Sequence, residues 1–343
     1  MRRTSYSIIL SIIGVCVLIG FGLATFYKGG NGIVQAAPGR VPAQLGINEP
    51  ILPIPLPAGL DANKVALGET LFNEVKLSGN DSISCAHCHN LDAGGTDGLK
   101  HSFGINGAEG DINAPTVFNS GLHIAQFWDG RAETLEDQID SPIHNPKEMG
   151  SSWPQIIAKL GADPVYVATF NKLYPDGITG HNIKDAIATF ERALVTVNAP
   201  FDRYLRGEKN AISENAKAGY QLFKDYGCVA CHQGTNVGGN MFQVFGVMRD
   251  YFADRGHITK ADLGRFNVTG LEEDKHVFRV PCLRLVTLTA PYFHDGSAKT
   301  LHEAIHVMAR YQLGREIPDE DEARIIEFLH TLVGEYKGKR LTP

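Results

Sequence analysis

Two short motifs contain the residues with the clearest chemistry in this chain. Residues 85–89 read CAHCH and residues 228–232 read CVACH, so both have the pattern C-x-x-C-H. In this pattern the two thiols add across the vinyl groups of a porphyrin, and the following histidine is placed to bind the iron. The sequence therefore predicts two covalently attached c-type haems. The residues that would hold them are Cys85, Cys88, His89, Cys228, Cys231 and His232.

Two other uses of paired cysteines fit this sequence less well. A zinc site built from two C-x-x-C pairs normally holds those pairs much closer along the chain. A thioredoxin-like motif needs one C-x-x-C beside a βαβ unit and does not require the histidine. Zinc and redox thiols therefore stay open only as weaker alternatives to haem.

The sequence around the motifs repeats, and the repeat predicts the helices that position each haem. GETLF at 68–72 precedes the first motif, and GYQLF at 219–223 precedes the second. Apolar residues three and four apart predict closing helices over 183–195 and 320–333. An entry helix, a haem-binding loop and a closing helix make a cytochrome c unit. We therefore expect two such units that meet near residue 210.

The predicted fold class is mainly α, with two cytochrome c-like domains behind an N-terminal hydrophobic segment. The predicted domains cover residues 38–210 and 211–343. Residues 1–37 are basic and hold an apolar run over 8–26, long enough to cross a bilayer. Val34-Gln35-Ala36 also resembles a signal cleavage pattern. A cleaved signal peptide and an inner-membrane anchor both stay open, and either places the rest of the chain in the periplasm.

The composition excludes several classes of protein. With 43% hydrophobic and 20% charged residues among 343, both halves can bury an ordinary core. A disordered chain, a collagen and a polytopic membrane protein are therefore excluded. The formal charge is −6, whereas a nucleic-acid binder needs a basic face. We expect no nucleic-acid partner, and a basic protein partner is allowed.

Longer runs of sequence resemble the bacterial dihaem cytochrome c peroxidases. The runs are INAPT at 112–116, QFWDGRA at 126–132, FRVP at 278–281 and APYFHDGS at 290–297. With both haem motifs, the resemblance extends from about residue 50 to about residue 335. It implies an enzyme that reduces hydrogen peroxide to water, with electrons from a small periplasmic cytochrome c or copper protein. It also implies a homodimer.

The resemblance implies roles for residues near each iron. Met308 matches the methionine ligand of the electron-accepting second haem, where a thioether raises the reduction potential. Its alternatives are ordinary packing of a methionine and ligation by His302 or His306. Glu148 matches an essential acid, and Gln138 a glutamine, at the first, peroxidatic haem. A carboxylate can move the proton that O–O cleavage needs, and an amide can stabilise developing charge.

Five further residues acquire expected roles from the same resemblance. Trp128 matches a tryptophan between the haems, which would couple the two irons. Asn113 matches a side-chain ligand of a calcium ion, completed by the backbone carbonyls of Thr289 and Pro291, and such oxygen ligands suit calcium. Arg279 is expected either to pair with a haem propionate or to form a structural salt bridge.

One position departs from the family pattern. Many members have a histidine that caps the peroxidatic iron in the oxidised enzyme, and Ile105 stands at that place here. Isoleucine cannot bind iron, so we expect an open iron that needs little or no reductive activation. His101, four residues earlier, is the substitute ligand that could replace the missing cap. Cys282 is a second unusual residue, which we expect to be a buried free thiol.

Two other functions compete with the peroxidase. One is the related dihaem enzyme that oxidises side chains of a partner protein during quinone-cofactor maturation. That branch uses a tyrosine ligand, and the match at Met308 argues against it. The other is a plain electron-transfer cytochrome, which would need six-coordinate irons and would have no use for Glu148.

Overall fold

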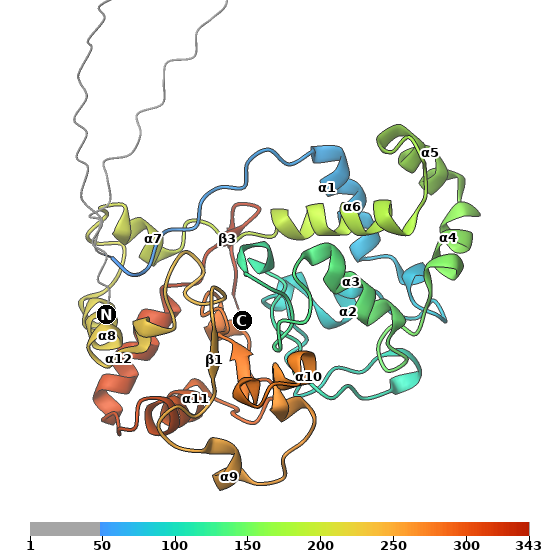
Figure 1. Cartoon of the computed structure of the whole chain (residues 1–343). Coiled ribbons are helices and arrows are strands. Elements are labelled where there is room, and N and C mark those ends of the chain that lie inside the picture. Colours follow the sequence, from blue (N-terminus) through green and yellow to red (C-terminus); the bar gives the residue numbers. More distant parts are fainter. Residues whose placement is uncertain (1–48, 343) are drawn as a thin grey trace, which may run out of the picture. The chain divides into compact units, whose positions relative to one another are not determined.

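The computed structural model describes residues 49–342, and helices form most of its regular structure (Figure 1). The longer helices are α1 Ala62–Phe72, α3 Leu135–His144, α4 Trp153–Gly161, α5 Pro164–Leu173, α6 Gly180–Ala193, α8 Glu214–Asp225 and α12 Asp319–His330. The short helices are α2 Cys85–Cys88, α7 Pro200–Leu205, α9 Tyr251–Arg255, α10 Phe266–Thr269 and α11 Leu301–Val307. This confirms the mainly α class. The predicted signal or anchor over 1–37 lies outside the described residues.

Strands and single helical turns fill the connections. The strands pair antiparallel as β1 Phe242–Val244 with β2 Val277–Arg279, and as β3 Glu335–Tyr336 with β4 Lys339–Arg340. The 3₁₀ turns are Val75–Leu77, Leu91–Ala93, Ile105–Gly107, Ser120–Leu122, Cys228–Ala230, Ala261–Leu263, Glu272–Asp274 and Val286–Leu288, and a π-helical turn covers Met308–Gln312. None of the helices in this part of the chain is both long and apolar enough to span a membrane.

Helices α1 and α6 pack against each other and frame the first half (Figure 1). Asp61 caps α1 and Thr179 caps α6, because each side chain accepts backbone N–H groups of the first turn. The helices cross at Gly68, where any side chain would overlap the carbonyl oxygen of Ala186. The closing helix predicted over 183–195 begins earlier, at Gly180, because Thr179 supplies the cap.

Helices α8 and α12 make the equivalent pair in the second half (Figure 1). They cross at Gly219, where a side chain would overlap the carbonyl oxygen of Arg324. Tyr220 and Phe223 of α8 pack their rings against Phe328 of α12. The helix predicted over 320–333 ends at His330, and the chain then turns while Leu332 and Val333 stay buried.

Each of the two helix pairs packs around its own hydrophobic core. Each core also contains residues from the other half of the chain. Ile51, which precedes α1, lies in the second core, whereas Leu285 and Val333 lie in the first. The buried Arg284 links these segments. Its guanidinium donates hydrogen bonds to Asp202 Oδ1 at 2.7 Å and to the carbonyl of Leu52 at 2.9 Å. The predicted domain boundary near residue 210 stays a prediction.

Candidate functional site

The first haem motif leaves one histidine nitrogen free to bind a metal. Cys85–Cys88 forms the short helix α2, and the His89 amide donates to the Cys85 carbonyl at 3.0 Å. His89 Nδ1 lies 3.3 Å from the Gly95 carbonyl oxygen, so Nδ1 carries the proton and Nε2 keeps its lone pair. Burial lowers the pKa of His89, although the Gly95 hydrogen bond opposes this shift. The neutral imidazole that results is the form a metal binds.

The second motif repeats this arrangement. The His232 amide donates to the Cys228 carbonyl at 2.9 Å, and His232 Nδ1 lies 3.4 Å from the Val237 carbonyl oxygen. Burial lowers the pKa of His232 to about 4. Two histidines oriented in the same way, each just after a pair of cysteines, fit two axially ligated haems.

The motif thiols are unpaired and available for attachment. The cysteines at 85, 88, 228, 231 and 282 are all free. Between residues 49 and 342, the one group of histidine, cysteine and carboxylate atoms that could share an ion is Asp262, His294 and Asp295. Arg255 already pairs with both of these carboxylates at 2.7 Å. Nothing in this arrangement supports a zinc site built from the two motifs.

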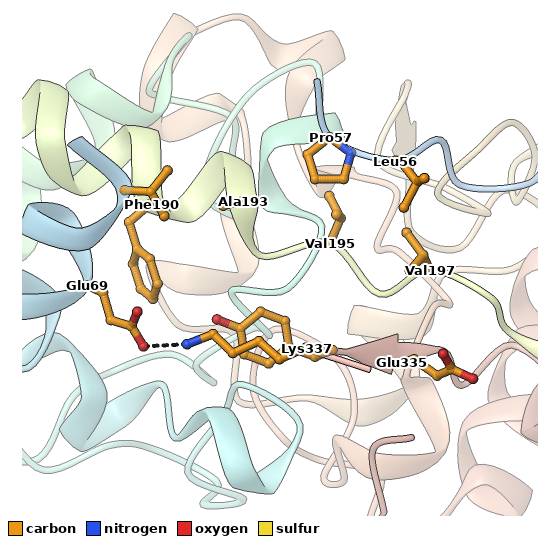
Figure 2. A pocket seen from close by; sticks show the side chains of 11 residues that line it. Leu56, Pro57, Glu69, Phe190, Ala193, Val195, Val197, Glu335 and Lys337 are labelled. Atoms are coloured by element: carbon orange, nitrogen blue, oxygen red, sulfur yellow. Dashed lines mark hydrogen bonds and ion pairs between the residues drawn. The ribbon is translucent and has the colours of Figure 1, made fainter. Parts of the chain in front are cut away.

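A large cavity joins the first motif to most of the predicted catalytic residues. It has a volume of about 1140 Å³, and its lining combines residues of both halves of the chain. The predicted residues on its wall are Cys85, Cys88, His89, Asn113, Trp128, Gln138, Glu148 and Arg279. A separate hollow of about 270 Å³ contains none of them (Figure 2). There, mostly apolar side chains surround an ion pair of 2.6 Å between Lys337 and Glu69.

Glu148 has the environment of a proton-transfer group. Its carboxylate accepts a hydrogen bond of 2.7 Å from Asn145 Nδ2. Burial raises the pKa of Glu148, while the Asn145 hydrogen bond and the charge of Arg131 lower it. A carboxyl group with raised proton affinity on the wall of this cavity can both take and give a proton. Gln138, from α3, lines the same cavity.

Trp128 lies where the two halves of the chain meet. Its indole Nε1 donates to the Asn113 carbonyl at 3.0 Å, and its own carbonyl accepts from the Arg279 amide at 2.8 Å. Its ring stands edge-to-face against His294 at 6.4 Å between centroids. The Asn113 side chain is buried, and its Nδ2 donates to the Leu99 carbonyl at 2.8 Å. The calcium site of Asn113, Thr289 and Pro291 stays a prediction.

Unsatisfied polar atoms test whether the cavity fits a haem. Arg279 is 3% exposed, and burial lowers its pKa to about 10, yet its Nη1 has no hydrogen-bond partner. Ser120 Oγ, both ring nitrogens of His123 and one oxygen of Glu191 line the same cavity and are equally unpaired. A buried cation without a carboxylate partner within residues 49–342 requires an anion from elsewhere. The propionates of a haem fit this requirement better than a structural salt bridge does.

Sequence reasoning missed His123, Ser120 and Glu191. His123 follows a 3₁₀ turn, and burial lowers its pKa well below the usual value, with Arg279 acting in the same direction. Burial raises the pKa of Glu191, in the middle of α6, to about 8. The sequence could have indicated only Glu191, because it is a charged residue at a core position of the predicted closing helix.

Met308 lies outside this cavity, on the element that follows α11. It opens the π-helical turn Met308–Gln312, and such turns are frequent at functional sites. Leu301 and Ile305 of α11 pack against the second core together with Cys228. The competing His302 is 65% exposed and pairs with Glu322, and His306 is 58% exposed. Both histidines are exposed, and the assignment of Met308 as a haem ligand stays a prediction.

The two unusual residues have clear positions. Ile105 packs against the first core and is not among the described residues that line the cavity, whereas His101 does line it. His101 Nδ1 is held by Glu109 at 3.0 Å. Cys282 is a free thiol that contacts Asn236 Oδ1 at 2.8 Å, and burial raises its pKa to about 12.

Two helical units, each with a C-x-x-C-H motif and an oriented histidine, define a dihaem c-type cytochrome. Comparisons with known proteins agree. Residues 62–210 match the family described as di-haem cytochrome c peroxidase. The chain is 53% identical over 290 residues to cytochrome c peroxidase Ccp of Escherichia coli, covering 84% of this chain and 62% of that protein. It is 44% identical over 298 residues to cytochrome c551 peroxidase of Nitrosomonas europaea, covering 87% and 88%.

A solved structure shows the same fold. A MauG-like protein associated with microbial copper homeostasis superposes with a TM-score of 0.72 at 30% identity, covering 84% of this chain and 95% of that one. The chain therefore belongs to the di-haem cytochrome c peroxidase family. It is an oxidoreductase of the cytochrome c peroxidase class, which takes peroxide as its electron acceptor. The family is di-haem, which agrees with the two motifs.

Proposed function

We propose that this enzyme works in the periplasm, and that it takes electrons from a small cytochrome c or copper protein at the second haem. One hydrogen peroxide, two electrons and two protons give two molecules of water. The iron of the first haem supplies the place where peroxide is bound and reduced. The observation that carries this proposal is the single cavity that His89 and Glu148 share.

Each residue of the cavity has a task in this proposal. Glu148 takes a proton from one peroxide oxygen and gives it to the other, because its buried carboxyl has a raised proton affinity. Gln138 offers an amide to the charge that develops as the O–O bond breaks. Trp128, tied to the backbones of Asn113 and Arg279, couples the two halves electronically. Arg279 holds a haem propionate.

The remaining assignments rest on the family resemblance. Met308 completes the second haem, and a calcium ion is bound by Asn113 with the carbonyls of Thr289 and Pro291. The enzyme forms a homodimer. It is either soluble in the periplasm after signal cleavage or held at the inner membrane by residues 8–26.

The Glu148→Gln enzyme tests the proposal. Glutamine keeps the shape of the side chain but cannot carry the proton, so peroxide turnover should be lost. The absorption spectra of both haems should stay close to those of the parent enzyme. Turnover at the parental rate would remove Glu148 from its role.

We also propose that the resting enzyme needs no reductive activation, because Ile105 stands where a capping histidine would be expected and an isoleucine side chain could not bind the iron. Turnover should then start without a lag whether the enzyme is fully oxidised or pre-reduced by one electron. A low-spin, six-coordinate spectrum for both haems of the oxidised enzyme would contradict this and would indicate His101 as the cap.

The partner-protein-oxidising alternative is not favoured. That branch uses tyrosine as a haem ligand, whereas Met308 stands at the corresponding place. Efficient peroxide turnover with a reduced small cytochrome separates the proposed enzyme both from that branch and from a plain electron carrier.

A further inference from the structure

Residues 102–110 form a loop that lies against the turn carrying Glu148. We propose that Ile105 is a positioning residue, which wedges this loop against the 145–150 turn and so fixes the Glu148 carboxylate in the cavity. The proposal rests on the proton-transfer role of Glu148 given above. We call this contact between the 102–110 loop and the 145–150 turn the brace, because it would hold the Glu148 carboxylate in place.

The loop is a well-defined unit. Phe103 and Glu109 face each other in an antiparallel bridge. The Gly110 amide donates to the Ser102 carbonyl at 2.9 Å, and the Gly104 amide donates to the Ala108 carbonyl at 2.9 Å. These bonds close a small hairpin, so its tip at Ile105 moves together with its base.

Ile105 makes the closest link between the hairpin and the turn. Its amide donates to the Glu148 carbonyl at 2.8 Å. Its δ-methyl group occupies the space that a side chain at Gly150 would fill, and Gly150 has a left-handed φ of +52°. Gly104 approaches so closely that a side chain there would overlap the backbone of Lys147. The two segments therefore touch through backbone at Gly104 and through one apolar side chain at Ile105.

The other side of the turn is also fixed. The Glu148 amide donates to the Asn145 carbonyl at 3.0 Å, and Asn145 Nδ2 donates back to the Glu148 carboxylate at 2.7 Å. The Met149 amide donates to the Pro142 carbonyl at 3.1 Å. Glu148 is thus held between α3 and the hairpin. Truncating Ile105 removes the apolar contact with Gly150, whereas the Ile105 amide bond, the bond of 2.7 Å from the Gly79 amide to the Met149 carbonyl and the α3 contacts remain.

Truncation of Ile105 tests the brace. Ile105→Ala should lower kcat by up to about 100-fold, because a misplacement of about 1 Å can cost a factor of that order, with little change in KM for peroxide. Ile105→Val removes the δ-methyl group alone and should cause a smaller fall in kcat. Phe103→Ala is the matched control, because Phe103 is in the same hairpin but its side chain is exposed. Its kcat should equal that of the parent.

The pH profile reports on Glu148 itself. Burial raises the pKa of Glu148, so a loosened, wetter turn should move the acid limb of kcat/KM to lower pH. Charged or titratable groups on the same cavity wall include Cys88, His89, His101, Asp111, His123, Asp129, Arg131, Lys147, Glu191 and Arg279, and all remain in the variant. In a Glu148→Gln background, Ile105→Ala should not reduce the residual rate further.

The outcomes separate the two proposals. Parental kcat and an unmoved acid limb in both Ile105 variants, with Glu148→Gln inactive, would overturn the brace alone. Parental turnover by Glu148→Gln would overturn the proposed role of Glu148. If Ile105→Ala is too unstable to purify, Ile105→Val decides the question by the same two measurements.

Discussion

Replacing Gly219 by alanine tests whether the crossing of α8 and α12 frames the second haem unit. In a helix interior this change ordinarily stabilises a protein by about 1 kcal/mol. At Gly219, however, the new methyl group would overlap the Arg324 carbonyl and press on the Ile325 amide. Overpacking costs about 1–3 kcal/mol, and backbone atoms cannot rotate away, which favours the upper end of that range. We expect a net destabilisation of about 2 kcal/mol.

Urea denaturation of the haem-loaded protein measures the change in the free energy of unfolding. Unfolding is monitored by far-ultraviolet circular dichroism and by Soret absorption. Gly161→Ala is the matched control, because Gly161 ends α4 and a methyl group there would meet no atom within 4 Å. It should leave stability unchanged or raise it by at most about 1 kcal/mol. Gly68→Ala should be destabilising in the first unit for the same reason as at Gly219. A Gly219→Ala protein as stable as the parent would refute the helix crossing.

Two further predictions concern the cavity. Asn145→Ala removes a hydrogen bond that lowers the pKa of Glu148, so the acid limb of kcat/KM should move to higher pH. This shift is opposite to the one expected for Ile105→Ala. An unmoved acid limb would contradict the hydrogen bond between Asn145 and Glu148. Arg279→Gln removes a buried positive charge, so the reduction potential of the haem beside it should fall in a spectroelectrochemical titration. Parental potentials at both haems would show that Arg279 does not face a propionate.

Local sequence was sufficient to predict the haem-binding histidines and the helices around them. His89 and His232 are fixed by carbonyls five or six residues away, so a short motif already contains most of their geometry. The entry helices were predictable for a similar reason, because Gly68 and Gly219 stand at equivalent places in a visible repeat. Helix ends were less accurate, since Thr179 acts as a cap in front of the apolar pattern.

Features that join distant segments could not be predicted in this way. The unpaired atoms of Arg279 and His123 share one cavity although they come from different halves of the chain. The sequence shows that Ile105 cannot bind iron, but its contact with Gly150 depends on how two loops fold against each other. The place of Ile51 in the second core is equally invisible to any local pattern.

Ile51, in the second core, forms an isolated parallel bridge with Gly234, and this contact has a consequence for the order in which the chain folds. Gly234 donates to the Pro50 carbonyl at 2.7 Å and accepts from the Leu52 amide at 3.3 Å, and Arg284 then reaches the Leu52 carbonyl. Contacts between such distant positions form late, because the long loop between them must first be closed. Gly234 follows the second haem motif by two residues. We therefore expect the segment at residues 50–52 to dock after the local contacts around the second motif have formed.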